Sequence, residues 1–138
     1  MTLIVDSGAL YATLDRDDQD HAACLHLLSG TREQIVIPAP VLVEVDYWIG
    51  QRLSPVVLIK LLADTESGLL KIEDLIPQDY RRVSEICAQY SDSYIGFVDV
   101  AVLAIVERLN EPKLATIDHR HFRMLRPRHV AALELLPA

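Results

Sequence analysis

Asp99 is the residue of this chain whose chemistry most needs an explanation. It interrupts residues 96–106, an otherwise apolar run of helical length. An ionised carboxylate that is buried alone costs several kcal/mol, so Asp99 requires a hydrogen-bonding partner, a shared proton or a cation.

Three other carboxylates are placed where a folded α/β chain would bring them near Asp99. Asp6 and Asp118 each follow an apolar run typical of a buried strand, and Glu44 lies in a mainly apolar segment directly after another such run. In parallel α/β sheets, sites form at the carboxyl ends of strands and at the helix starts that follow them. The four acids therefore predict a metal site in that crevice.

The ion that such a site favours follows from its donor atoms. Aspartate and glutamate oxygens match Mg²⁺ or Mn²⁺ better than zinc. One or two of these ions can activate water and orient a phosphodiester for hydrolysis. Without metal, mutual repulsion should raise at least one of the four pKa values, so metal binding is expected to release protons.

Each acid except Asp99 also has a simpler explanation when it is considered alone. Asp6 can cap the helix that follows it, Asp118 can cap a short helix, and Glu44 can lie on an exposed helix face. One metal site replaces these separate explanations with a single one, which is why we favour it.

Composition is typical of a compact globular protein. The chain has 138 residues, of which 51% are hydrophobic and 24% charged. This length predicts a single domain over residues 1–138. Its apolar segments are too short to cross a bilayer, so we expect a cytoplasmic protein with no membrane association. Cys24 and Cys87 lack the spacing of zinc ligands and are interpreted as buried thiols.

The net charge of −7 is distributed unevenly along the chain. Four arginines and two acids from residue 116 onward give that segment a charge of +2, which leaves −9 for the first 115 residues. Solvation and binding to phosphate explain this basic segment equally well, and Arg120, Arg123 and Arg126 are the candidates for RNA phosphate contacts. His119 and His121 are interpreted as solvated or phosphate-facing groups rather than metal ligands.

Strand-like and helix-like segments alternate without a long linker or a repeat. Such alternation predicts an α/β/α sandwich with a central, mainly parallel sheet flanked by helices. The expected strands are residues 3–6, 35–37, 69–72, 114–117 and 131–135, the last of them a candidate edge strand. The expected helices start near residues 7, 17, 38, 54, 77 and 96.

With these motifs in view, the chain resembles PIN-domain ribonucleases, and more narrowly the VapC toxins of type II toxin-antitoxin systems. The resemblance spans essentially the whole chain, and it depends on the order and spacing of four segments: 5–10 (VDSGAL), 43–47 (VEVDY), 95–101 (IGFVDVA) and 114–122 (LATIDHRHF). Gly8 stands where many relatives have serine or another small residue.

This resemblance implies a PIN-like fold and a Mg²⁺-dependent (or Mn²⁺-dependent) endoribonuclease that cleaves tRNA or rRNA with metal-activated water. It places the catalytic and metal-binding quartet on Asp6, Glu44, Asp99 and Asp118. It also implies a homodimer, inhibited by a cognate VapB-like antitoxin whose C-terminal segment enters the active-site groove. Ser7 and Thr116 match hydroxyl positions near the metal and are expected to support it.

Within this expectation, the four acids are assigned different tasks. Asp6 and Asp99 are expected to hold the metal most directly, Asp118 to bind the same ion or a second one, and Glu44 to orient water.

Other functions remain open at this point. A PIN-type nuclease that acts in RNA processing or on DNA, without an antitoxin, has the same acids. A non-catalytic module that uses the acids to bind a basic peptide is a further alternative. An aspartate-dependent phosphatase is disfavoured, because Gly8 stands where its second carboxylate is expected.

Overall fold

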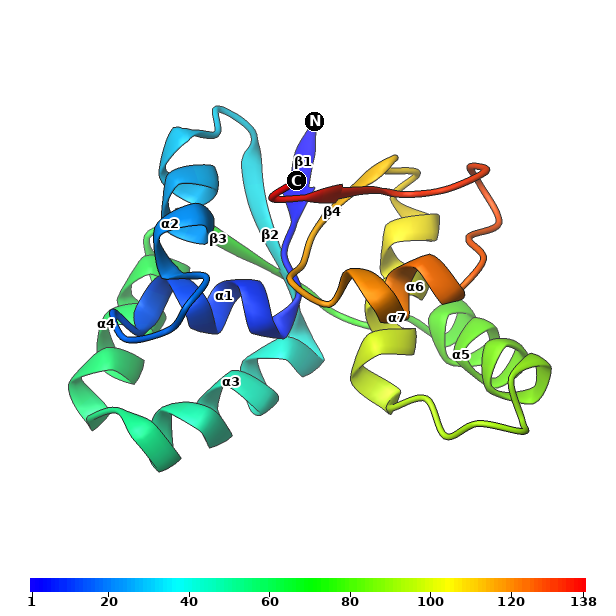
Figure 1. Ribbon diagram of the computed structural model, residues 1–138, viewed down its shortest axis with the longest axis horizontal. Coiled ribbons are helices and arrows are strands. Elements are labelled where there is room, and N and C mark those ends of the chain that lie inside the picture. Colours follow the sequence, from blue (N-terminus) through cyan, green and yellow to red (C-terminus); the bar gives the residue numbers. More distant parts are fainter.

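The computed structural model describes residues 1–138. Its strands are all parallel to their neighbours, and Figure 1 shows β1 and β2 in the middle of the molecule. Three of them form one sheet in the order β1-β2-β3, with β2 in the centre, and β4 and β5 form a second pair. Their bounds are β1 (Thr2–Ile4), β2 (Gln34–Pro38), β3 (Leu70–Glu73), β4 (Lys113–Ala115) and β5 (Glu134–Leu136).

An isolated parallel bridge between Val5 and Ala115 connects the two sheets. There the main-chain amide of Asp6 donates to the Ala115 carbonyl at 2.8 Å. The chain therefore runs outward from β1 through β2 to β3, then returns to the other side of β1 for β4 and β5. This reversal is a topological switch point, the place where open α/β sheets form binding crevices at the carboxyl ends of strands.

Seven helices cover this sheet. In Figure 1, α1 to α4 gather on one side of the strands, and α5 to α7 on the other. Their bounds are α1 (Ser7–Leu14), α2 (His21–Gly30), α3 (Ala39–Arg52), α4 (Pro55–Glu66), α5 (Pro77–Gln89), α6 (Phe97–Arg108) and α7 (His119–Met124). The predicted architecture, a parallel sheet flanked by helices, is confirmed.

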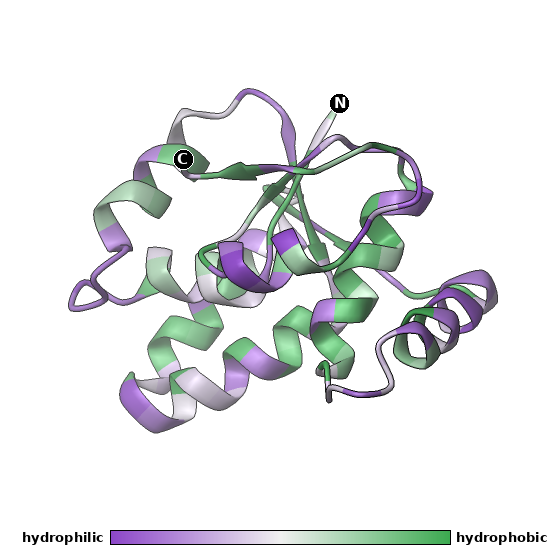
Figure 2. Cartoon of the chain, turned by 45° about the vertical axis from the view of Figure 1, so that its right-hand side comes forward, coloured by the Kyte–Doolittle hydropathy of each residue, from purple (hydrophilic) through white to green (hydrophobic).

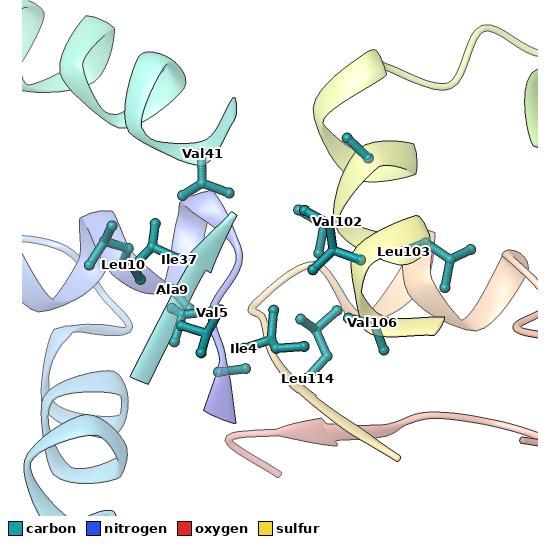
Figure 3. Close-up of a cluster of buried hydrophobic side chains, with 14 of the residues drawn as sticks. Ile4, Val5, Ala9, Leu10, Ile37, Val41, Val102, Leu103, Val106 and Leu114 are labelled. Carbon is teal, nitrogen blue, oxygen red and sulfur yellow. The ribbon is translucent and has the colours of Figure 1, made fainter. Parts of the chain in front are cut away.

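Helix α6, which bears Asp99, is the central helix of the core. Every residue from 100 to 106 is buried, as expected of a helix that is apolar on all sides. Figure 3 shows Val102 and Val106 of this helix near Ile4 of β1 and Leu114 of β4. Because α6 packs so tightly, the start of the helix, and Asp99 with it, has a well-defined place beside the switch point.

Colouring by hydropathy shows the same division between inside and outside. In Figure 2 the strands and inner helices are mostly hydrophobic, and the hydrophilic segments lie in the outer helices and loops. The core cluster contains 30 buried hydrophobic residues drawn from strands and helices along the chain. None of the helices has the length and apolar character needed to cross a membrane.

Most of the predicted element starts are confirmed, and the differences have local causes. Ser54 caps α4 by accepting the amide of Val56 at 3.3 Å. Helix α2 begins four residues later than expected, because Asp18 instead accepts the amide of Asp20 within a turn. Strand β4 ends at Ala115, two residues before the predicted end.

The interpretation of both cysteines as buried thiols is wrong for one of them. Cys24 is buried in α2, but Cys87 is exposed in α5. Helix α5 turns only a narrow apolar stripe toward α6, including Val83 and Ile86, and Cys87 falls outside that stripe.

Candidate metal centre

Asp6 lies at the switch point, between the end of β1 and the start of α1. Its side chain makes no capping hydrogen bond to the helix. Instead Oδ2 accepts the hydroxyl of Thr116 at 3.0 Å, while the buried Oδ1 has no partner in the protein. Helix capping therefore does not explain Asp6, and a buried carboxylate oxygen without a partner requires a cation or a proton.

The electrostatics of the metal-free protein agree with this geometry. The pKa of Asp6 is raised to about 7, first by burial and then by the negative charge of Asp99. The pKa of Asp99 is raised as well, first by burial and then by Asp118, against the opposing effect of His121. The predicted increase in pKa is present in two acids, although burial contributes more to it than repulsion does.

Asp99 and Asp118 approach each other from different elements, α6 and the start of α7. The ring of His121 lies against both: its Nδ1 is 3.1 Å from Asp99 Oδ2 and 2.9 Å from Asp118 Oδ2. Asp118 also caps α7, because its Oδ1 accepts the amide of His121 at 3.2 Å. Capping and site formation are thus compatible at Asp118, since Oδ1 accepts the main-chain amide of His121 while Oδ2 faces its ring.

Glu44 completes the group from α3, on the opposite side of the crevice. It lines a single cavity of about 440 Å³ together with the three aspartates. Asp46, two residues along the same helix, is exposed, as expected for the other helix face. The complete lining consists of Asp6, Ser7, Gly8, Glu44, Trp48, Asp99, Ile117 and Asp118.

The cavity offers its negative charge without basic compensation, because neither lysine nor arginine lines it. It also contains the unpartnered, buried hydroxyl of Ser7 beside the unpartnered Asp6 Oδ1. Oxygen donors of this kind fit a hard divalent cation such as Mg²⁺ or Mn²⁺. The residues that would hold the ion are Asp6, Asp99, Asp118 and Glu44.

Thr116 connects two of these acids. Its hydroxyl donates to Asp6 and accepts the main-chain amide of Asp118 at 3.0 Å. The side chain is fully buried, so the hydroxyl holds the end of β1 and the start of α7 in a fixed relation. Gly8 allows a close approach at the same point, because a Cβ there would lie 2.8 Å from Ile117 Cγ1.

The three candidate phosphate-binding arginines, Arg120, Arg123 and Arg126, are exposed and stand outside the cavity lining. The two histidines of the same segment differ from each other. His119 Nε2 contacts the carbonyl of Thr116 at 3.1 Å, whereas His121 contacts the acids. The interpretation of both as solvated or phosphate-facing groups therefore does not hold for His121.

Sequence reasoning also did not identify Trp48 and Ile117 as lining residues. Trp48 stands one helical turn after Glu44, and its spacing of four residues is the signal that could have placed it on the same face. For His121, the corresponding signal was its position three residues after the helix-capping Asp118.

Fold and site together define a class: parallel α/β proteins with a cavity lined by carboxylates at the switch point of the sheet. Comparison with known proteins is more specific. A family model described as PIN domain matches residues 3–126, and the chain belongs to that family. The resemblance drawn from the sequence motifs is thereby confirmed.

Individual relatives resemble the chain along most of its length. Ribonuclease VapC26 of Mycobacterium tuberculosis is 27% identical over 125 residues, which are 91% of this chain and 93% of that protein. Among solved structures, Mycobacterium tuberculosis VapC20, described as a sarcin-ricin loop cleaving toxin, superposes with a TM-score of 0.81 at 16% identity. That match covers 94% of this chain and 98% of VapC20.

A second solved structure, VapBC2 from Rickettsia felis bound to a DNA fragment from their promoter, has a TM-score of 0.71 at 18% identity. The match covers 98% of this chain and 97% of the matched chain in that structure. At these identities the structural matches establish the fold, which is the fold of VapC toxins.

Proposed function

We propose that this chain is a VapC-type endoribonuclease, the toxin of a VapBC-like toxin-antitoxin pair, acting as a single PIN domain over residues 1–138. One observation supports it above the others: four carboxylates from four separate segments line one cavity whose lining includes neither lysine nor arginine. Structural acids are normally paired with lysine or arginine, whereas here one histidine ring contacts two of four acids, so the group indicates an external cation.

In this proposal Asp6 and Asp99 bind the ion most directly. Asp118 binds the same ion or a second one, and Glu44 orients the attacking water from the opposite side of the cavity. Thr116 keeps Asp6 and Asp118 in register, and Ser7 supports the same position. A divalent ion bound there supplies Lewis-acid activation of water and compensates charge on the phosphate.

The names of the relatives support RNA as the substrate. One is a ribonuclease and another a sarcin-ricin loop cleaving toxin. For this chain we propose tRNA or rRNA, with Arg120, Arg123 and Arg126 contacting phosphates beside the cavity. The acidic cavity suits a VapB-like antitoxin that delivers a basic side chain. We further propose that the toxin is a cytoplasmic homodimer.

The test is cleavage of total cellular RNA by the purified, antitoxin-free protein with Mg²⁺, with Mn²⁺ and with EDTA. We expect discrete fragments that require metal, and their mapped ends would identify the target. Asp99→Asn should reduce the rate on the order of a thousandfold, because several kcal/mol of metal-dependent stabilisation is lost. Asp92→Asn is the matched control, since Asp92 is exposed before the same helix.

Other results would replace the proposal with one of its alternatives. Cleavage of DNA but not RNA in a parallel assay would indicate a DNA nuclease of the same family. Full activity in EDTA or in Asp99→Asn would contradict the metal assignment. An absence of both metal binding and cleavage would favour the interaction module.

A further inference from the structure

The His121 ring brings a side-chain nitrogen into contact with two of the four acids. Its Nδ1 lies 3.1 Å from an oxygen of Asp99 and 2.9 Å from an oxygen of Asp118. One donor atom from each of these three residues falls within a group whose members lie at most 4.8 Å apart. The helix α7 produces this arrangement, because Asp118 caps it and His121 follows one turn later.

These separations match those of neighbouring ligands on one ion. Bonds of about 2.1 Å at right angles place two ligand atoms about 3.0 Å apart in octahedral coordination. The same separations suit hydrogen bonds from Nδ1–H, so distance alone does not choose between a ligand and a hydrogen-bond donor. Two further observations make coordination the better explanation.

The first is the buried Oδ1 of Asp6, which has no partner in the protein and lies in the same cavity as Asp99 and Asp118. The second is the other ring nitrogen of His121, Nε2, which makes no hydrogen bond. Because the His121 side chain is 46% exposed, Nε2 can carry the hydrogen toward solvent while Nδ1 presents its lone pair.

We propose that His121 is a metal ligand of this centre, through Nδ1, and that it biases the site toward Mn²⁺ or another transition ion over Mg²⁺. This inference rests on the proposed function, since it assumes that the four acids bind a divalent ion. Imidazole is a borderline ligand that suits transition metals, whereas Mg²⁺ prefers oxygen ligands and retained waters. A mixed set of carboxylates and one imidazole therefore discriminates between the two ions, which an all-carboxylate set does poorly.

The direct test is pulsed electron paramagnetic resonance of Mn²⁺ bound to the purified protein, with histidine labelled by ¹⁵N in a parallel sample. Wild type should show the electron spin-echo modulation of one coordinated nitrogen, and labelling should change it to the ¹⁵N pattern. His121→Asn should bind Mn²⁺ without this modulation. Since the side chain is half-exposed on a surface helix, the variant is expected to fold.

His119→Asn is the matched control, because His119 lies in the same helix but contacts only the Thr116 carbonyl. It should keep the nitrogen signal. By calorimetry, His121→Asn should weaken Mn²⁺ binding by about tenfold and Mg²⁺ binding by much less. Equal losses for both ions would indicate a general role in positioning the acids and would overturn the preference.

Failure of this inference is distinguishable from failure of the proposed function. Mn²⁺ binding without a nitrogen signal would refute ligation by His121 and leave the four-acid centre intact. No Mn²⁺ binding by the wild type at all would refute both.

Discussion

The two ends of helix α6 carry buried carboxylates in opposite electrostatic settings. At its start, Asp99 belongs to the acidic cavity, where no lysine or arginine is present. At its end, Glu107 accepts Nε of Arg82 at 2.7 Å, and Arg108 donates through Nε to Asp79 at 3.0 Å. The side chains of Glu107 and Asp79 are 8% and 3% exposed, so these acids are more deeply buried than Asp99, whose side chain is 20% exposed.

The ion pairs at the end of α6 connect several elements. Arg108 also reaches Glu73 at 3.1 Å, so one guanidinium connects α6 to β3 and α5. Arg128 joins Glu85 of α5 to the segment after α7, and its amide donates to Glu107 at 2.7 Å. We refer to the set Glu73, Asp79, Arg82, Glu85, Glu107, Arg108 and Arg128 as the α5–α6 ion-pair network.

The pKa values report the difference between the two groups. In the network, the hydrogen bond with Glu107 is the first cause of the raised pKa of Arg82, so the Arg82 guanidinium stays charged beside it. In the cavity, burial raises the pKa of Asp6 to about 7 because no cation offsets it. The acids of the network come with arginine counter-ions, whereas neither lysine nor arginine lines the cavity.

The largest expected effect concerns Asp6 in metal-free protein, studied in EDTA. Below pH 3.8 the carboxyl is protonated in both the folded and the unfolded state. Between about pH 4 and 7 only the folded state keeps the proton, so the free energy of unfolding falls as pH rises. Asp6→Asn removes this cost, and its stability gain over wild type should grow to about 4 kcal/mol by pH 8. Urea denaturation at a series of pH values measures the gain.

Saturating Mn²⁺ provides the control for this prediction. The ion should stabilise wild type more than Asp6→Asn and so narrow the difference at pH 8. If the stability gain of Asp6→Asn were constant from pH 4 to 8, the charge of Asp6 would be balanced by groups of the folded protein. That result would contradict the difference between the cavity and the α5–α6 ion-pair network.

The next effect in size tests the network. Arg108→Ala leaves Asp79 and Glu73 without their guanidinium, and breaking a buried pair from one side costs about 3 kcal/mol. The free energy of unfolding measures this loss, and RNA cleavage per folded molecule should stay near the wild-type rate. Lys60→Ala is the control, because the exposed Lys60–Asp64 pair contributes less than about 1 kcal/mol. If both variants lost a similar amount of unfolding free energy, the network would contribute no more to stability than an exposed ion pair.

Much of the fold was predictable because it depends on local patterns. The alternation of apolar strands with capped or proline-initiated helices determines a parallel sheet, and Ser54 and Pro55 begin α4 as expected. The convergence of the four acids has the same origin, since parallel strands bring the residues after their carboxyl ends to one edge of the sheet. Asp99 independently supported the prediction of a site, because a charged side chain within a buried helix needs a hydrogen-bonding partner, a proton or a cation.

The features that the sequence did not indicate depend on side-chain directions and long-range pairing. The ion-pair network joins residues up to 43 positions apart, and periodicity holds no information about such distant partners. The contact of His121 with Asp99 joins residues 22 positions apart, so the predicted helix cap at Asp118 did not reveal it. The exposure of Cys87 depended in the same way on how narrow the buried stripe of α5 is.

The smallest effect concerns Thr116, which is neutral but buried among the charges of the cavity. Thr116→Val is nearly isosteric and removes both the donor to Asp6 and the acceptor for the Asp118 amide. Losing a residue that orients metal ligands should weaken Mn²⁺ binding by about tenfold, and leaving the buried amide unsatisfied should cost about 1 kcal/mol of stability. Calorimetric titration and urea denaturation measure the two losses separately.

Thr65→Val in α4 is the matched control, since the Thr65 hydroxyl donates only to the Leu61 carbonyl. If Thr116→Val lost stability but kept full metal affinity, Thr116 would stabilise the fold only. The positions of Asp6 and Asp118 would then not depend on its hydroxyl.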